Sequence, residues 1–207
     1  MKIALCDIGL GNMRSVERAI ARAASDAGRG DVTTVSRAHD ARALEGADAI
    51  VFPGQGGFGA CAAALDAGLG AALRDRIRGG ARYVGICLGM QLLFESSEEA
   101  PGARGLGIFP GVVKKLRPAS PLKVPHCGWN RAEAARARPE LFEGAPWFYF
   151  VHSYVCAPED EAIVAARTTY GEPFVSAVAH GELFACQFHP EKSQAAGIAL
   201  LGKVLFA

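Results

Sequence analysis

Short apolar runs and amphipathic helical repeats alternate along the first hundred residues of the chain. The runs at 2–7, 49–52 and 83–86 contain few polar residues, as expected of strands buried on both faces of a sheet. Between these runs, apolar residues recur at the spacing of amphipathic helices. This alternation predicts a parallel sheet with right-handed crossovers, whose ligands bind at the carboxyl ends of the strands. We expect helices at 13–25, 38–44 and 61–77, and a further short strand at 32–35.

The second half of the chain has a different pattern, in which proline and glycine separate short strand-like runs. Several strands in series predict antiparallel additions to the sheet. A helical repeat returns at 194–206, and no linker is evident. We therefore predict an α/β fold with a central mixed, mostly parallel sheet flanked by helices. The strand-like runs lie at 112–116, 147–154, 163–166, 174–178 and 183–188.

Length and charge exclude several classes of function. The chain has 207 residues, which is enough for a sizeable core, and we expect residues 1–207 to form a single domain. The net charge is only +1 and charged residues are dispersed, so nothing indicates nucleic acid or an anionic membrane as a partner. No apolar run approaches the roughly 20 residues of a membrane-spanning helix.

The cysteines bear on the compartment. They lie far apart and form no C-x-x-C pair. The first apolar run is interrupted at Asp7, too early for a signal peptide. We therefore expect a cytoplasmic protein with reduced thiols. The cysteines are Cys6, Cys61, Cys87, Cys127, Cys156 and Cys186.

Cys87 occupies the most informative position in the sequence. It is the centre of Gly85-Ile86-Cys87-Leu88-Gly89, the cysteine form of the G-x-S-x-G nucleophile elbow. In such an elbow a sharp strand-to-helix turn exposes the nucleophile, and the positive end of the helix favours a thiolate. A lone cysteine here would otherwise be a small core residue. A base and an oxyanion site are therefore needed to support a catalytic role.

A candidate base lies in the segment QFHPEKS at 187–193. In an extended chain, residues two apart project to the same side, so His189 and Glu191 can face one way. The carboxylate could then orient the imidazole and stabilise its protonated form, which is the third role in a catalytic triad. The alternative is that H-P-E is only a turn leading to the helix at 194–206.

The glycine-rich segment at 54–59 formally matches G-x-G-x-x-G directly after a strand. A dinucleotide site requires the helix to begin there and an acidic residue at a later strand end. We expect the helix to begin at Cys61 and to contain Asp75, which argues against that site. Consecutive glycines also expose backbone N–H groups to developing negative charge. Beside Cys87, this segment would form an oxyanion hole completed by the N–H of Leu88.

The other histidines and Trp129 are less informative. The histidines at 39, 126, 152 and 180 show no metal-ligand spacing, so we expect hydrogen-bonded or surface side chains. Trp129 lies in a loop bounded by proline and glycine. It belongs either to the core or to a surface that binds a partner.

Motifs along the whole chain resemble those of the class I (triad-type) glutamine amidotransferases. The combination of G-x-C-x-G with H-P-E is specific to that superfamily. Three further segments are similar to the glutaminase subunits of imidazole glycerol phosphate synthase, an enzyme of histidine biosynthesis. These segments are GNMRSV at 11–16, PHCGWN at 125–130 and YFVHSY at 149–154.

The resemblance implies a triad of Cys87, His189 and Glu191. The thiolate would attack the side-chain amide of glutamine, and water would then hydrolyse the glutamyl thioester. The resemblance also implies an oxyanion hole made by the Gly54–Gln55 peptide and the N–H of Leu88, and no metal or organic cofactor. The residues implied to hold glutamine are Gln91, Glu99 and the backbone of Ser153 and Tyr154.

The resemblance further implies a heterodimer with a separate (β/α)8-barrel cyclase subunit. Ammonia would pass through a tunnel to the cyclase and react with PRFAR, giving imidazole glycerol phosphate and AICAR. We expect the interface to include Gly9, Leu10, Gly11, Asn12 and Trp129. The family often has Val, Met and Tyr where this chain has Gln55, Cys127 and Val155. Of these departures, Gln55 bears on the oxyanion geometry.

Two other functions remain open on sequence alone. One is an amidotransferase subunit of another pathway, such as anthranilate, GMP or pyridoxal phosphate synthesis. The segments at 11–16 and 125–130 argue against it. The other is a thiol-sensing or interaction protein on the same scaffold, which would need a reactive cysteine but neither H-P-E nor a glutamine site. Glutamate release in the presence of the partner separates an enzyme from such a protein.

Overall fold

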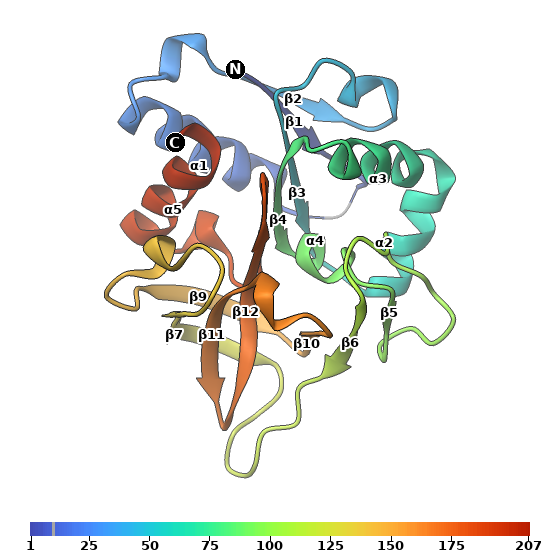
Figure 1. The fold of residues 1–207 in the computed structure, drawn as a ribbon, viewed down its shortest axis with the longest axis vertical. Helices are drawn as coiled ribbons and strands as arrows, with labels where there is room; N and C mark the ends of the chain where they lie inside the picture. The colour runs from blue at the N-terminus through green and yellow to red at the C-terminus, as the bar shows by residue number, and fades with distance from the viewer. Residues whose placement is uncertain (10) are drawn as a thin grey trace.

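A mixed β-sheet runs through the molecule and carries helices on both faces of one half (Figure 1). The computed structural model describes residues 1–9 and 11–207. The strand order is β2-β1-β3-β4-β13-β12-β10-β6-β5, with β11 and β8 continuing beyond β12 on a branch. A separate two-stranded sheet pairs β7 with β9.

The helix-flanked half of the sheet is parallel. In it, β1 (Lys2–Cys6) pairs with β2 (Thr34–Ala38) and β3 (Ala49–Gly54), and β4 (Arg82–Cys87) pairs with β3 and with β13 (Leu183–Cys186). This half is the parallel sheet that the first apolar runs predict. The helices are α1 (Met13–Asp26), α2 (Phe58–Ala64), α3 (Gly70–Arg78), α4 (Leu88–Gln91) and α5 (Gln194–Phe206).

The other half of the sheet is antiparallel except at its outer edge, where β5 and β6 run parallel. It confirms the prediction that the later runs add antiparallel strands. Its strands are β5 (Ser96–Ser97), β6 (Gly111–Lys115), β8 (Glu133–Ala134), β10 (Tyr154–Pro158), β11 (Val164–Tyr170) and β12 (Glu172–His180). The separate sheet consists of β7 (His126–Arg131) and β9 (Trp147–His152).

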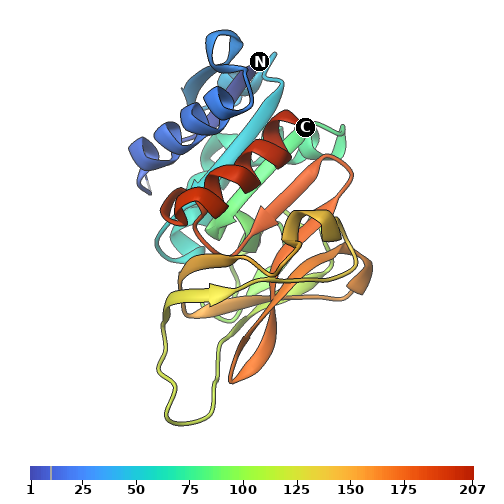
Figure 2. The same cartoon turned by 90° about the vertical axis from the view of Figure 1, so that its left-hand side faces the viewer.

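Two apolar clusters, one on each face of the parallel strands, form the core. Helices α1 and α5 lie side by side on one face, as both views show (Figure 2). Their buried residues, such as Ile20 and Leu201, pack with Val84 and Ile86 of β4. On the other face, Tyr83 of β4 packs with residues of α2 and α3. The central strand therefore has apolar side chains on both faces, as its apolar run predicts.

The helix expected at 38–44 is wrong. Ala38 ends β2, and only a single 3-10 turn forms, at Arg42–Leu44. The carboxylate of Asp40 caps this turn by accepting a hydrogen bond from the N–H of Ala43, with a distance of 2.9 Å. A segment this short cannot offset the cost of helix nucleation without strong tertiary packing.

The helix expected at 61–77 is divided and begins earlier. It begins with α2 at Phe58 and passes through a π-helical turn (Leu65–Leu69) into α3. The early beginning has a distant cause, because Glu99 accepts a hydrogen bond of 2.8 Å from the N–H of Phe58. A cap supplied from 41 residues away leaves no local signal in the sequence.

The strand expected at 147–154 is two strands. It divides at Ser153 into β9 and β10, which belong to different sheets. The β7 strand, which carries Trp129, was not expected either, because the sequence indicates a loop there. Helix α4 contains only four residues, Leu88–Gln91, although apolar residues continue to Phe94.

All six cysteines are free thiols. Within the described ranges, no helix has both the length and the apolar character needed to span a membrane.

Two glycines of α5 provide a matched pair of substitutions for testing its packing. A methyl group at Gly197 would lie 1.9 Å from the carbonyl oxygen of Pro190, whereas one at Gly202 would meet no atom within 4 Å. We predict that Gly202→Ala stabilises the protein by about 0.5–1 kcal/mol, because alanine is the better helix former. Gly197→Ala should lower stability by more than about 1 kcal/mol through overpacking. Chemical denaturation measures both, and equal effects would contradict the close packing at Gly197.

Candidate active site

Cys87 has a strained backbone at the point where β4 meets α4. Its φ of 54° and ψ of −104° lie outside the conformations that a residue with a side chain usually adopts. Such strain costs on the order of 1–3 kcal/mol and is found mainly at functional sites. Helix α4 begins at the next residue, Leu88. The turn therefore has the strand–turn–helix geometry of a nucleophile elbow.

The glycine of the elbow that follows Cys87 allows α4 to pack against the sheet. A methyl group at Gly89 would lie 2.0 Å from the carbonyl oxygen of Phe52 in β3. Only glycine fits without moving one of these elements. Leu88 is in turn pressed against Gly54, where an added methyl group would lie 2.6 Å from the Leu88 Cβ.

Strand register brings three segments together at the carboxyl edge of the sheet. Cys87 pairs directly with Gly54 of β3, and Ile86 pairs with Cys186 of β13. His189 follows Cys186 by three residues, so it emerges at the same edge as Cys87. The peptide after Gly54 and the imidazole of His189 therefore flank the cysteine from two neighbouring strands.

His189 and Glu191 form a buried pair. The Nδ1 atom of His189 lies 2.8 Å from Oε1 of Glu191, and each side chain is only 2% exposed. The link between them is a 3-10 turn (Pro190–Lys192), so the extended chain expected from the sequence is wrong here. The backbone of His189 is held on both sides: its N–H donates to the carbonyl of Tyr149 at 2.9 Å, and its carbonyl accepts from the hydroxyl of Ser193 at 2.6 Å.

The surroundings of His189 favour its protonated form. Burial alone would lower the pKa of His189, but its interactions with Cys87 and Glu191 outweigh burial and raise the pKa to about 9. Because Nδ1 is directed to Glu191, Nε2 is the nitrogen available to the cysteine. The arrangement can hold a thiolate beside an imidazolium and pass a proton from the imidazolium to a leaving group.

A cavity of about 440 Å³ opens beside the cysteine. Most of the residues proposed from sequence for the triad, the oxyanion hole and glutamine binding line this cavity. Gly54 and Glu191 lie next to it but do not line it. Among the lining residues are Gln55, Cys87, Leu88, Gln91, Glu99, Ser153, Tyr154 and His189.

Gln187 is a residue of the site to which no sequence motif assigns a role. It is completely buried, and its Nε2 atom lies 3.5 Å from the sulfur of Cys87. Its Oε1 atom accepts a hydrogen bond of 3.0 Å from Gln91. The only sequence signal is its position within the strand-like run at 183–188, two residues before His189.

His126 and His152 form a second buried contact beside the cavity. His126 Nδ1 lies 3.0 Å from His152 Nε2, and His152 Nδ1 lies 2.9 Å from the carbonyl oxygen of Tyr154. Burial lowers the pKa of His152 to about 3 and that of His126 to about 4, so both are neutral at pH 7. These two residues are hydrogen-bonded histidines, as expected. They nevertheless support the cavity wall at Tyr154.

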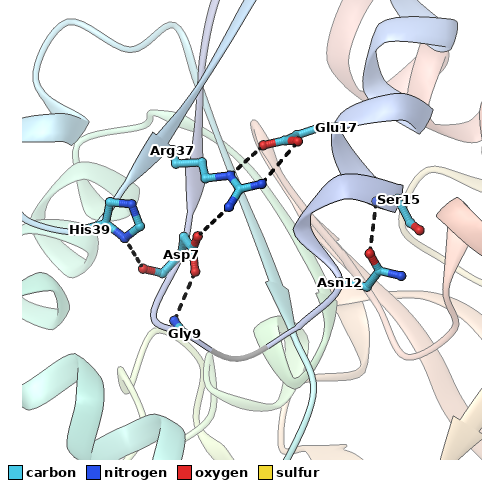
Figure 3. Close-up of polar contacts among 7 residues, drawn as sticks. All are labelled: Asp7, Gly9, Asn12, Ser15, Glu17, Arg37 and His39. Atoms are coloured by element: carbon cyan, nitrogen blue, oxygen red, sulfur yellow. Dashed lines mark hydrogen bonds and ion pairs between the residues drawn. The ribbon is translucent and has the colours of Figure 1, made fainter.

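Polar contacts fix both ends of the loop that was expected to face a partner (Figure 3). The carboxylate of Asp7 accepts from the N–H of Gly9 at 3.0 Å and pairs with Arg37 at 3.4 Å. At the other end, the side chain of Asn12 caps α1 by accepting from the N–H of Ser15 at 3.2 Å. Leu10, also expected in the interface, lies outside the described residues.

The outward face of the β7–β9 pair is aromatic. Trp129 lies opposite Tyr149 in the register and is 44% exposed. Trp147 is two residues from Tyr149, on the same face, and is 54% exposed. Trp129 is therefore a surface residue and not part of the core.

Comparison with known proteins decides the family. The family model described as "Glutamine amidotransferase class-I" matches residues 9–204. A protein from Methanopyrus kandleri named imidazole glycerol phosphate synthase subunit HisH is 45% identical, covering 99% of this chain and 98% of the relative. The HisH subunit of Methylococcus capsulatus is 43% identical over 98% of this chain and 95% of that protein. The chain belongs to the class-I glutamine amidotransferases, among the HisH subunits.

Solved structures support the fold of this class-I amidotransferase. A crystal structure titled as a glutamine amidotransferase has a TM-score of 0.69, with 19% identity over 97% of this chain and 98% of the other. The glutaminase domain of Trypanosoma brucei CTPS with bound acivicin has a TM-score of 0.68, with 17% identity over 99% and 93% of the two chains. At these identities the likeness concerns the fold alone.

The three departures from the usual HisH pattern lie in different surroundings. Gln55 lines the cavity, Cys127 is an exposed thiol 3.5 Å from the hydroxyl of Tyr149, and Val155 pairs with Lys114 across β10 and β6.

The helix of the G-x-G-x-x-G segment begins at Phe58, earlier than expected, but Asp75 lies within α3. The acidic residue that a dinucleotide site needs at a strand end is thus not supplied by Asp75.

We predict that the imidazole of His189 titrates near pH 9 in this HisH chain. Because the folded state favours its protonated form, the stabilisation from that charge is complete below about pH 6.5 and is lost as the pH rises through about 9. In Cys87→Ala the titration midpoint of His189 should fall by more than about one pH unit, since the substitution removes a partner that favours the protonated imidazole. NMR of labelled imidazoles measures both titrations. An unchanged midpoint in the variant would show that Cys87 does not interact with His189.

Proposed function

We propose that the chain hydrolyses L-glutamine to glutamate and ammonia with Cys87 as the nucleophile. The observation that carries this proposal is the buried His189–Glu191 pair at 2.8 Å beside a strained cysteine. The thiolate attacks the side-chain carbonyl carbon, and His189 gives its proton to the nitrogen, which leaves as ammonia. His189 then takes a proton from the water that attacks the thioester, releasing glutamate and restoring the thiolate.

The oxyanion formed in each step is stabilised by backbone N–H groups. We assign these to the Gly54–Gln55 peptide and to Leu88, since Gly54 pairs with Cys87 and Leu88 begins α4. The peptide also lies near Gly11 of the loop before α1. A methyl group at Gly11 would lie 3.9 Å from the Gln55 nitrogen and 4.0 Å from the carbonyl oxygen of Pro53. A change in the loop can therefore alter the orientation of the peptide.

The glutamine lies in the 440 Å³ cavity, held by Gln91, Glu99 and the backbone of Ser153 and Tyr154. The Nε2 atom of Gln91 is already directed to Gln187 and Tyr154, which leaves its Oε1 atom for the substrate. Glu99 supplies a negative charge suited to the α-ammonium group of glutamine.

Two alternative functions predict different results. A subunit of another pathway would not transfer ammonia to PRFAR. A thiol sensor would not release glutamate.

The ammonia passes to a cyclase subunit in a heterodimer. The relatives are named as subunits of imidazole glycerol phosphate synthase, which supports the presence of a partner subunit. We propose that this partner is a (β/α)8-barrel cyclase that converts PRFAR to imidazole glycerol phosphate and AICAR in histidine biosynthesis. We assign the interface to the loop with Gly9, Leu10, Gly11 and Asn12, and to Trp129. The exposure of Trp129 and the fixed ends of the loop support this assignment.

The whole chain, 1–207, works as one glutamine amidotransferase domain in the cytoplasm. Strands and helices from both ends of the sequence contribute to the same edge of the sheet, which favours one domain over two. Free thiols are typical of reducing compartments.

We predict that Cys87→Ala and His189→Ala lose glutamine-dependent synthesis by more than about a thousand-fold, since each removes a member of the catalytic unit. The ammonia-dependent reaction of the cyclase partner should be unchanged. Glutamate release and product formation in the complex measure the two reactions. Cys61→Ala, which removes a thiol buried in α2, serves as the control and should keep both. Glutamate release by Cys87→Ala would contradict the assignment of the nucleophile.

We also predict that the isolated chain hydrolyses glutamine slowly and that the complex loaded with PRFAR is faster by at least about tenfold. A tenfold change corresponds to about 1.4 kcal/mol, which the reorientation of one peptide hydrogen bond can supply. Steady-state glutamate release from the chain alone, the complex, and the complex with PRFAR measures the effect. Equal turnover in all three would rule out control through the Gly54–Gln55 peptide.

A further inference from the structure

Gln187 contacts the reacting sulfur from inside the protein. Its side chain is completely buried behind Cys87, with Nε2 at 3.5 Å from Sγ, and it does not line the cavity. The cavity side of the sulfur is thus left open for a substrate. A hydrogen bond from this direction can act on the sulfur at every stage without obstructing attack.

Hydrogen bonds to a backbone carbonyl determine which way the Gln187 amide points. The carbonyl oxygen of Tyr154 can only accept, so the Gln91 atom 3.4 Å away is its NH2 group. The same NH2 group lies 3.0 Å from the other amide, so Gln187 presents its oxygen to Gln91. Its own NH2 group is therefore the group that faces Cys87, and it can only donate to the sulfur.

The carbonyl of Tyr154 is itself held by His152, which is held in turn by His126. His152 donates to it from Nδ1 at 2.9 Å, so its Nε2 must accept, and His126 Nδ1 is the donor at 3.0 Å. The remaining nitrogen of His126 then accepts from the amide of Asn130 at 3.3 Å. Each group in this network has one possible assignment, and neutral histidines are what the network requires.

We propose that Gln187 is a further catalytic residue: its side-chain N–H donates a hydrogen bond to the Cys87 thiolate, and Gln91 holds the amide in that orientation. The inference rests on the proposed glutaminase function. It adds a second hydrogen-bond donor to the sulfur of Cys87, besides His189. Hydrogen bonds to ionised groups are about twice as strong as neutral ones, so the contact stabilises thiolate over thiol. Gln91 thereby serves the nucleophile as well as the substrate.

The test measures alkylation of Cys87 by iodoacetamide as a function of pH. The background is Cys127→Ser, because Cys127 is the other accessible thiol and the remaining four are buried. In Gln187→Met, which keeps the volume but has no donor, the alkylation midpoint should rise by about one pH unit. The value of kcat in the PRFAR-loaded complex should fall by about 10- to 100-fold with KM changed less than threefold, as expected for a lost bond to a charged group.

Gln187→Glu is a second variant of the same shape that still accepts from Gln91 but presents an oxygen to the sulfur. It should shift the midpoint further in the same direction. The titratable side chains near the sulfur or lining its cavity are unchanged in both variants: His189 with its partner Glu191, Cys156, Cys186, His152, Tyr154, Glu99 and Lys192.

Ser176→Ala is the matched control. Ser176 is equally buried, its carbonyl oxygen accepts from the Gln187 N–H at 2.9 Å, and its hydroxyl has no partner among the described residues. It should leave the alkylation midpoint and kcat unchanged. If Gln187→Met behaves like Ser176→Ala, Gln187 only fills space and the inference is wrong.

A measurement on the unsubstituted Gln187 covers the case in which these variants do not fold. In protein labelled at glutamine side-chain nitrogens, one amide proton should shift downfield as Cys87 ionises, and this shift should vanish in Cys87→Ala. If no glutamine amide proton shifts downfield in the parent protein as Cys87 ionises, the inference is wrong. Failure of the proposed function would instead appear as no glutamate release from the parent complex, whatever the alkylation profile.

Discussion

The parallel pairing of β4 between β3 and β13 is the constraint on which the site depends. It places the Gly54 peptide, Cys87 and the segment that leads to His189 at one edge of the sheet. A slip of one residue would turn the apolar side chains of β4 to the opposite face. Apolar clusters on both faces of the sheet therefore hold the geometry of the proposed site.

The second constraint is the attachment of His189 to the separate two-stranded sheet. Its backbone donates to the Tyr149 carbonyl, and Ser193 joins the His189 carbonyl to the Tyr149 N–H at 3.0 Å. Tyr149 belongs to β9, whose outward face carries exposed tryptophan. The surface proposed for a partner and the proposed catalytic base are thus connected through a single residue of one strand.

The elements with strong periodicity could be predicted from the sequence, and those determined by distant contacts could not. Helix α5 has the bounds that the sequence predicts, 194–206, because its apolar repeat runs uninterrupted from Gln194. The beginning of α2 depends on Glu99, and the two buried histidines depend on the pairing of β7 with β9. Cys87, His189 and Glu191 could be proposed as a group from motifs alone. Gln187 could not, because its role follows from which atoms of two amides meet.

The burial of the other thiols has a consequence for the chemical durability of the protein. Burial raises the pKa of Cys6 and Cys61 to about 12 and holds those of Cys156 and Cys186 well above the ordinary range. Oxidants react with accessible thiolates, so these four sulfurs are shielded from them. Damage by peroxide would then concentrate on Cys87 and on the surface thiol Cys127. A bound glutamine, by covering Cys87, would protect the protein from its most damaging oxidation.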